Sequence, residues 1–355
     1  MNVLIRADAS LVIGSGHVMR CLTLADQLRT KGMTVAFVCR NVPGGMFDLL
    51  SARGYQTVAI EGDWSQQFDA EETIKVVSQV FSEGLDWLVV DHYELDVEWE
   101  RMLRPHVRKL FVIDDLANRF HDCDLLLDQN YENSERYRPW IGDNCQMLLG
   151  AFYALIRPEY AALRMTSRRE IVNRVLVFFG GSDPDDLTGL ALDALSDSIL
   201  SALEVDVVIG HNYSYHKKLE NQALIRGKTN IYGPQPHLAA LMAGADIAIG
   251  AGGATNWERM CLGLPSIVIT LADNQVPISK ILHRKGALRL IGSSKEVTVK
   301  SIRDALIDEI FSRCYSDRVN LALAQCDGLG LNRVVQVIHD FRDSIKTEGD
   351  ILNSN

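Results

Sequence analysis

The sequence has no long apolar run. Hydrophobic residues make up 47% of its 355 residues, yet no stretch approaches the ~18 consecutive apolar residues that a membrane-spanning helix needs. The first residues, Met1 to Asp8, read as a short strand, without the basic start and the longer apolar stretch of a signal peptide. We therefore expect neither export nor a transmembrane segment.

An excess of basic residues is also missing. The 46 acidic residues outnumber the 36 Lys and Arg residues, and the formal net charge is −10. Nucleic acids and anionic membranes attract clusters of Lys and Arg, which the sequence does not show. We therefore expect no nucleic-acid partner, although a local basic cleft for phosphate is compatible with this composition.

Patterns typical of disulfides, metals and two large enzyme classes are absent as well. The seven cysteines form no Cys-x-x-Cys pair, and their odd number and wide spacing favour reduced thiols and a cytoplasmic protein. The nine histidines show no His-x-x-x-His spacing, so we expect no metal and no cofactor. The missing Gly-x-x-x-x-Gly-Lys-Ser/Thr and Gly-x-Ser-x-Gly motifs count against a P-loop NTPase and an α/β-hydrolase.

Short apolar runs rich in Val, Ile and Phe alternate with stretches of helical periodicity. This rhythm is typical of parallel βαβ units, and it breaks near residue 160 and restarts at Arg174, so we predict an α/β fold with two doubly wound domains. The expected strands are 3–5, 35–39, 57–60, 87–91, 110–114 and 125–127, then a run from 174, 205–210, 230–232, 246–250 and 266–270. The expected divisions are an N-terminal domain (1–155), a linker (156–173), a C-terminal domain (174–345) and a polar, frayed tail (346–355).

The first glycine loop stands where α/β proteins bind ligands. Gly14 and Gly16 lie between the first strand and a helix expected over 18–31, at the carboxyl end of the strand. The N–H groups at the start of such a helix favour an anion such as a diphosphate. Histidine is the residue type that ordinarily changes its charge near neutral pH, which makes His17 a candidate general base. A helix-capping turn with an incidental histidine is the alternative, since the spacing is not the dinucleotide-binding fingerprint.

Acidic residues follow neighbouring strands. Asp8 and Asp91 should both face the same cleft as His17, where one of them can orient the imidazole. The alternative is a structural carboxylate that accepts backbone N–H bonds. Tyr93 is a candidate sugar-contacting side chain. Asp114-Asp115 reads as a helix cap with a solvated neighbour, and we assign it no chemistry.

The second domain has two loops of small residues. Gly180, Gly181 and Ser182 suit a phosphate or the floor of a nucleotide site. The stronger loop, Gly252-Gly253-Ala254-Thr255, exposes backbone N–H groups to a pyrophosphate, and Glu258 is placed to accept hydrogen bonds from ribose hydroxyls. A capping box from Thr255 to Glu258 is the alternative. Asn274-Gln275 follows the next strand and should face the same ligand.

Taken in order, five motifs resemble those of one family. They are Gly14-x-Gly16-His17-x-x-Arg20, Asp91-His92-Tyr93, Leu148-Leu149-Gly150-x-x-Tyr153-Ala154-Leu155-Ile156-Arg157, Gly252-Gly253-Ala254-Thr255-x-x-Glu258 and Asn274-Gln275. The family is the UDP-2,4-diacetamido-2,4,6-trideoxy-β-L-altropyranose hydrolases of pseudaminic acid biosynthesis, and the resemblance covers about residues 1 to 290. It is similar to the lipid II-forming N-acetylglucosaminyltransferases. The resemblance implies their GT-B fold, two Rossmann-like domains with parallel sheets facing a cleft.

The resemblance also implies roles for the matching residues. His17 corresponds to the catalytic histidine, residues 252–255 to the diphosphate loop and Glu258 to the ribose-binding glutamate. The implied reaction is hydrolysis of the UDP-sugar at the anomeric carbon with inversion, for pseudaminic acid, surface polysaccharide or flagellin glycosylation. The residues expected around the substrate are Asp8, Gly14, Gly16, Arg20, Asp91, Tyr93, Asn274 and Gln275, and those around the nucleotide are Gly180, Gly181, Ser182, Gly252, Gly253, Ala254, Thr255 and Glu258.

Two other functions use the same motifs. A GT-B glycosyltransferase would activate an acceptor hydroxyl instead of water, and a nucleotide-sugar sensor would keep the 252–258 loop without needing His17. The chain departs from the family pattern in a longer region from Asn41 to Glu83 and an extension past about residue 300, so the sugar is less certain than the fold. We expect a monomer whose partner is a UDP-sugar.

Overall fold

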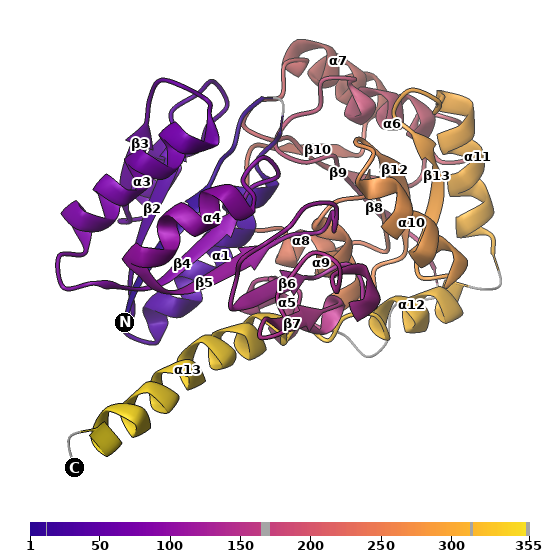
Figure 1. Ribbon diagram of the computed structural model, residues 1–355. Helices are drawn as coiled ribbons and strands as arrows, with labels where there is room; N and C mark the ends of the chain where they lie inside the picture. Colours follow the sequence, from indigo (N-terminus) through magenta and orange to yellow (C-terminus); the bar gives the residue numbers. More distant parts are fainter. Residues whose placement is uncertain (12, 165–170, 313–314, 353–355) are drawn as a thin grey trace.

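The computed structural model describes residues 1–11, 13–164, 171–312 and 315–352, with side chains as far as residue 341. Residues 165–170 of the expected linker, Cys314 and residues 353–355 lie outside the described residues. The chain forms two α/β lobes that stand side by side (Figure 1). Each lobe is built on one parallel sheet, so the predicted fold class is confirmed.

The N-terminal domain has a seven-stranded parallel sheet in the order β3-β2-β1-β4-β5-β6-β7. Its strands are β1 (Asn2–Ala7), β2 (Thr34–Arg40), β3 (Gln56–Ile60), β4 (Leu85–Asp91), β5 (Val107–Ile113), β6 (Leu125–Asp128) and β7 (Gln146–Leu149). Its helices are α1 (Gly16–Thr30), α2 (Phe47–Ala52), α3 (Gln66–Val80) and α4 (Val97–Leu103), with short 3₁₀ turns at Arg104–His106, Ser134–Arg136 and Ala151–Tyr153.

Both faces of this sheet are buried. Alternate residues of β1 point to opposite sides, so Val3 and Ile5 pack beneath α1, whereas Leu4 packs against α3 and α4. A strand covered on both sides must be apolar at nearly every position, which explains the continuous Val, Ile and Leu runs of the sequence. Parallel strands also end at one edge, and the loops after β1, β4 and β5 therefore share that edge.

The C-terminal domain has a six-stranded parallel sheet in the order β10-β9-β8-β11-β12-β13. Its strands are β8 (Arg174–Phe178), β9 (Glu204–Val208), β10 (Thr229–Tyr232), β11 (Ile247–Ala251), β12 (Ser266–Thr270) and β13 (Arg289–Ser293). Its helices are α6 (Leu187–Leu195), α7 (His216–Arg226), α8 (Ala239–Gly244), α9 (Thr255–Cys261), α10 (Gln275–Arg284), α11 (Val299–Ile310) and α12 (Tyr315–Leu323). Two strands that the sequence pattern did not predict, β7 and β13, are short edge strands, where a buried apolar run is not required.

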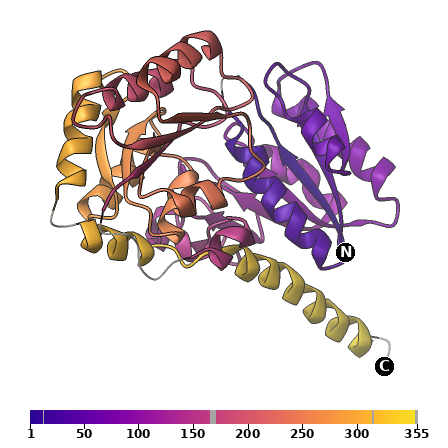
Figure 2. The same cartoon turned by 180° about the vertical axis from the view of Figure 1, so that it is seen from behind.

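The segments on either side of the C-terminal domain pack on different lobes. In the short helix α5 (Pro158–Ala162), Tyr160 packs in a core cluster with residues of α8 and α9. The last helix, α13 (Gly330–Leu352), leaves the second domain and runs under the first (Figures 1 and 2). Leu331 and Val334 join the core beneath α1, and the Phe341 ring lies 5.3 Å from that of Trp87.

This crossing changes two of our expectations. Residues 330–341, assigned to the C-terminal domain from sequence, pack on the N-terminal one because their apolar stripe fits the face of the first sheet that α1 leaves uncovered. The helix also continues to Leu352, so the first part of the expected frayed tail is helical. Of the helices in the described part of the chain, none is long and apolar enough to cross a membrane.

Candidate active site

His17 lies in the first turn of α1 and not in the loop before it. The helix begins at Gly16, two residues earlier than the sequence predicted. Gly14 has φ of 75°, which a residue with a side chain rarely adopts, and a Cβ atom at Gly14 or Gly16 would meet no described atom within 4 Å. The loop thus leaves open space beside the start of the helix, where backbone N–H groups lack partners within the helix.

The imidazole of His17 is held by a buried carboxylate. Its Nδ1 lies 2.5 Å from Oδ1 of Asp91, at the end of β4. Arg20, one turn later on α1, donates to both oxygens of Asp91, from Nε at 2.5 Å and from Nη2 at 2.6 Å. Because a carboxylate accepts hydrogen bonds, Nδ1 of His17 carries the proton, and Nε2 is the nitrogen that can take up another.

Charge keeps Asp91 ionised. Burial alone would raise the pKa of Asp91, but Arg20 and then His17 outweigh it and hold that pKa well below its usual range. Asp91 therefore stays an acceptor at any pH at which the protein works. The three side chains, His17, Arg20 and Asp91, form one unit from α1 and β4, and all three are buried.

Asp8 does not contact His17. Its carboxylate accepts hydrogen bonds from both terminal nitrogens of Arg6, at 2.6 and 2.8 Å, and from the backbone N–H of Arg40 at 2.7 Å. Nε2 of His92 lies 3.2 Å from the same carboxylate. Of the two carboxylates weighed for orienting the imidazole, Asp91 has the contact, and Asp8 instead ties β1 to β2 within a buried ion-pair network.

Tyr93 joins the two domains beside His17. Its ring packs edge-on against the imidazole, with ring centroids 4.5 Å apart. Its hydroxyl donates to Oδ1 of Asp115 at 2.9 Å and accepts from Nδ2 of Asn274, on the second domain, at 2.9 Å. Burial, helped by Asp115, raises the pKa of Tyr93 well above its usual value, so the hydroxyl keeps its proton.

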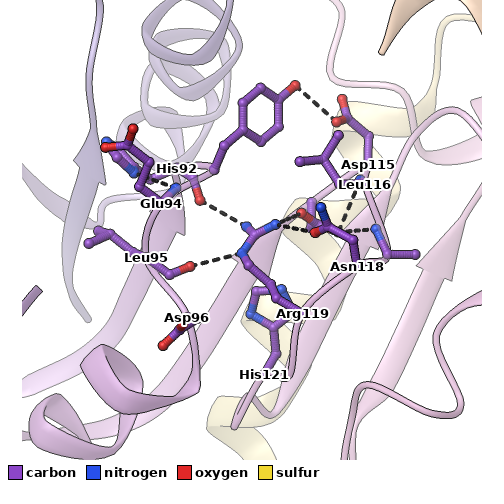
Figure 3. A network of polar contacts seen from close by, with 12 residues as sticks. His92, Glu94, Leu95, Asp96, Asp115, Leu116, Asn118, Arg119 and His121 are labelled. Carbon is purple, nitrogen blue, oxygen red and sulfur yellow. Dashed lines mark hydrogen bonds and ion pairs between the residues drawn. The ribbon is translucent and has the colours of Figure 1, made fainter. Parts of the chain in front are cut away.

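A partly buried arginine fixes the loop that carries Tyr93. Arg119 donates to the backbone carbonyls of His92 and Leu95, at 2.9 and 3.1 Å, and to Oδ1 of Asp114 at 2.7 Å (Figure 3). It therefore clamps the loop after β4 to the loop after β5. The side chain of the next residue, Asp115, points toward the hydroxyl of Tyr93. The position of Tyr93 relative to His17 is thus set by the chain and not by a ligand.

On the second domain, the small-residue loop follows β11 and opens α9. The helix begins at Thr255, and its N-cap is Ala254, which has no side-chain acceptor. The capping box considered for Thr255 and Glu258 is therefore wrong. A Cβ atom at Gly252 would lie 2.6 Å from Oγ of Ser279 on α10, so the loop passes close to that helix and has room for no larger residue.

Gln275 and Glu258 border this loop. Oε1 of Gln275 accepts the backbone N–H of Leu271 at 3.0 Å, which leaves its amide nitrogen near Gly253. Burial raises the pKa of Glu258 to about 7, against the opposing hydrogen bond from Tyr160. Hydroxyl donors, such as those of a ribose, would favour the ionised form of a carboxylate that is only partly ionised near neutral pH.

The glycine turn after β8 meets the loop of the first domain. A Cβ atom at Gly181 would lie 2.6 Å from Oγ of Ser15, the residue before α1. On its other side, a Cβ at Gly210 would lie 2.2 Å from the carbonyl oxygen of Gly181. Gly180, Gly181 and Ser182 therefore pack between the His17 loop and the turn after β9, at the junction of the domains.

Three residues at this junction were missed from the sequence. Asp115 accepts from Tyr93 and also from Nδ2 of Asn130 at 3.3 Å, and Oδ1 of Asn130 accepts from Nε1 of Trp257, on α9, at 3.1 Å. Asp115 thus contacts Tyr93 and Asn130, each of which hydrogen-bonds to the second domain. Asp115 follows a strand much as Asp91 does, but we interpreted it as a solvated neighbour of Asp114, whereas Asn130 and Trp257 carry no such signal.

The arrangement of the two lobes is that of known structures. The crystal structure of MurG from Acinetobacter baumannii superposes with a TM-score of 0.66 at 15% identity, covering 96% of this chain and 99% of that one. The chain has the GT-B fold. In this GT-B chain, residues 175–315 match the glycosyltransferase family 28 C-terminal domain, a segment that includes the 252–258 loop.

Two curated proteins are similar to the GT-B chain over most of its length. The UDP-2,4-diacetamido-2,4,6-trideoxy-beta-L-altropyranose hydrolase of Campylobacter jejuni is 25% identical over 288 residues, 81% of this chain and 97% of its own. The spore coat polysaccharide biosynthesis protein SpsG of Bacillus subtilis is 23% identical over 351 residues, 96% of this chain and 98% of its own. The resemblance read from the motifs therefore holds at the level of whole chains.

Proposed function

We propose that this protein hydrolyses a UDP-linked amino sugar, with UDP-2,4-diacetamido-2,4,6-trideoxy-β-L-altropyranose as the first candidate substrate. The coarser statement, a GT-B enzyme of nucleotide-sugar metabolism, is supported by the hydrolase match, the SpsG match and the family 28 domain together. The finer statement rests on one observation. Nδ1 of His17 contacts Asp91, and the imidazole packs against the ring of Tyr93, whose hydroxyl accepts a hydrogen bond from Asn274 of the second domain.

Nε2 of His17 is the proposed general base. A base needs an unprotonated nitrogen aimed at the water, and the Asp91 contact reserves Nδ1 for the proton and Nε2 for the lone pair. In the reaction, the oxygen of water bonds to the anomeric carbon while Nε2 removes its proton. The bond between that carbon and the phosphate oxygen breaks, and UDP leaves with the electron pair. Attack opposite the leaving group inverts the anomeric centre.

The second domain is proposed to hold UDP. α9 begins at Thr255, so the backbone N–H groups at the end of the 252–255 loop lie at a helix start, where they lack partners within the helix and would stabilise a leaving diphosphate. Glu258 would accept the ribose hydroxyls. UDP is a stable anion, so a second carboxylate to protonate it, as in ordinary glycosidases, is not needed. Asn274 and Tyr93 would face the sugar from opposite domains.

Incubation in ¹⁸O-water tests the bond that breaks. The full chain is mixed with a panel of UDP-sugars that includes the diacetamido-altropyranose compound, and the products are followed by NMR and mass spectrometry. We expect UDP release without any acceptor, ¹⁸O in the sugar only, and an initial product of inverted anomeric configuration. Label in UDP would mean attack at phosphorus and would overturn the mechanism.

A substitution of His17 tests the base. His17→Ala should lower kcat by about 10²-fold to 10⁴-fold, the usual contribution of a general base. The matched control is His106→Ala, because His106 is exposed in the turn before β5 and should not affect turnover. Unchanged turnover in His17→Ala would refute the proposed role of His17 as the general base.

A GT-B glycosyltransferase is the second candidate, because the family 28 match and the MurG structure favour it. It would use the same UDP loop and the same base to activate an acceptor hydroxyl. The two candidates separate on one measurement, since a transferase releases UDP at a useful rate only with its acceptor. UDP release that stays at background in water alone would favour transfer.

A further inference from the structure

A second hollow opens at the carboxyl edge of the first sheet, away from His17. It has a volume of about 270 Å³ and lies after β2 and β3, within the 41–83 region that departs from the family pattern. Its lining is Arg40, Asn41, Val42, Ile60, Glu61, Gly62 and Trp64. Pockets for drug-sized ligands have about 300–1,000 Å³, so this hollow suits a single ring.

Trp64 is the main feature of the hollow. Trp64 is 60% exposed, but one face of its ring makes a cation–π contact with Arg40, whose guanidinium carbon lies 4.3 Å from the ring centroid. Arg40 itself is buried and donates to Asp69 at 3.0 Å. Asp69 in turn accepts from Nε1 of Trp99 at 3.0 Å and from Arg6. The Arg40 side chain that contacts the indole is thus held in place by its buried partner Asp69, and this contact restrains the ring.

The backbone before α3 also fixes this ring. Ser65 caps the helix by accepting the N–H of Phe68, and Asp63 accepts the N–H and hydroxyl of Ser65. Trp64 stands between these two capping residues. A fixed aromatic ring with an exposed surface loses little conformational entropy when a ligand stacks on it, as in other recognition sites that use tryptophan.

The charges around the hollow select the ligand. Arg40 is neutralised by Asp69, whereas Glu61 and Asp63 stand exposed at the rim. A phosphate or a carboxylated sugar would meet these carboxylates, so an anionic ligand is disfavoured. Glu61 and the side-chain amide of Asn41 offer hydrogen bonds to hydroxyl groups, and the indole offers an apolar face. An uncharged pyranose has both, since its hydroxyls lie around the ring and its C–H bonds lie on the face.

We propose that this hollow binds an uncharged saccharide unit, separately from the UDP-sugar. The loop that leads to His17 contacts the chain next to the hollow, because the backbone N–H of Leu11 donates to the carbonyl of Pro43, the residue after Val42, at 3.1 Å. A saccharide on Trp64 therefore lies on the same edge of the sheet as the nucleotide sugar, one loop away. The proposal does not depend on hydrolysis, because it rests on residues that take no part in that reaction.

Saturation-transfer NMR on the full chain tests this site. The probes are the methyl glycosides of glucose, galactose, rhamnose and N-acetylglucosamine, with adenosine as a planar, uncharged ligand that is not a sugar. We expect at least one glycoside to bind, and Trp64→Ala or Asn41→Ala to weaken it about tenfold, a loss typical of one stacking or hydrogen-bonding group. Saturating UDP should leave the signal unchanged.

The matched control is Phe120→Ala. Phe120 is 57% exposed on the same domain and packs edge-on against Trp140, so its removal takes away an equally exposed ring without touching the hollow. Trp64→Phe provides a smaller change should Trp64→Ala unfold. UDP release should stay within about twofold in all these variants, which separates this inference from the proposed hydrolysis. No glycoside signal, displacement by UDP, binding of adenosine alone, or equal binding by Trp64→Ala would overturn the inference.

Discussion

Asp91 serves two basic side chains at once. It accepts from Nδ1 of His17 and from two nitrogens of Arg20, and all of these groups are buried. A buried charge without a partner destabilises the folded state. The close contacts of Asp91 with His17 and Arg20 are therefore needed to offset the burial of these groups. The same carboxylate therefore supports both the fold and the chemistry of the site.

Asp91→Asn should separate these two contributions. An amide nitrogen facing Nδ1 would make that atom an acceptor, so the proton would move to Nε2 and the base would be lost; kcat should fall about 10²-fold or more. The free energy of unfolding should fall by about 3 kcal/mol, because Arg20 loses its charged partner. Steady-state kinetics and urea unfolding measure the two effects. A variant with full turnover would contradict the assignment of Asp91 as the residue that positions the imidazole.

Glu258 predicts a pH dependence of stability. Burial raises the pKa of Glu258 from 4.5 to about 7, so between these values the folded protein binds more protons than the unfolded chain. The free energy of unfolding then falls as pH rises through this window. We expect the melting temperature of the wild type, measured relative to Glu258→Gln, to fall between about pH 4.5 and pH 7.5. Parallel curves for the two proteins would mean that Glu258 is fully ionised when folded.

At the residue scale, sequence reasoning worked where a rule about strand ends applied. It selected Asp91, Tyr93 and His17, which the fold brings together. It placed Asp8 in the same cleft because Asp8 also follows a strand. The carboxylate of Asp8 instead accepts hydrogen bonds from Arg6, which lies on that same strand, β1. Arg6 stands two residues before Asp8, on the same side of the strand, so the alternation of side chains could have predicted this pair. The backbone N–H of Arg40, which comes from another strand, could not be predicted in this way.

Among the elements, the turns at the junction of the domains fit each other tightly. The turn after β9 contains Gly210, and a Cβ atom there would lie 2.2 Å from the carbonyl oxygen of Gly181 and 2.4 Å from that of Gly180. Both contacts are with backbone, which cannot rotate away. Gly181 in turn lies against Ser15, so a shift of either turn would also displace the loop before α1, the helix that carries His17.

Gly210→Ala should therefore disturb both stability and activity. We expect the free energy of unfolding to fall by about 1–3 kcal/mol, as overpacking usually costs, and UDP release to decline with it. Gly244→Ala is the matched control, since a Cβ at the end of α8 would meet no described atom within 4 Å. Thermal unfolding and UDP release measure both variants. Equal behaviour of the two would contradict the tight fit of the turns.

Elements were easier to predict than their ends. The central strands were found because each is apolar along most of its length, whereas of the four edge strands β3 and β10 were found and β7 and β13 were not. The start of α1 was placed too late, because Gly16 is a poor helix former, and the helix begins there only in its tertiary context. The interdomain bonds from Asn274 and Trp257 could not be predicted, since they depend on how two separate sheets face each other.

For the molecule as a whole, α13 is a structural part of the first domain. Its buried residues Leu331, Val334, Val335 and Ile338 belong to the core under α1, and Nε2 of Gln27 donates to Oδ1 of Asn332 at 3.0 Å. The chain thus passes between the lobes twice. Two connections restrain the relative motion of the lobes more than a single linker would.

Deletion of residues 330–355 should destabilise the N-terminal domain. Four buried aliphatic side chains are lost, and at about 1.5–3 kcal/mol each the free energy of unfolding should fall by roughly 6–12 kcal/mol. Deletion of residues 346–355 is the control and should have little effect. Denaturant unfolding followed by near-ultraviolet circular dichroism reports on the packing of Trp87. A melting temperature equal to that of the full chain would show that the domain does not need the helix.

The return of α13 also imposes an order on synthesis at the ribosome. The first sheet has all of its strands once residue 149 has been made, yet one of its faces stays partly bare until residues 331–341 emerge. The nascent N-terminal domain must wait, with apolar surface exposed, while the whole of the second domain is translated. We therefore expect the partly made chain to be more prone to aggregation than the finished protein.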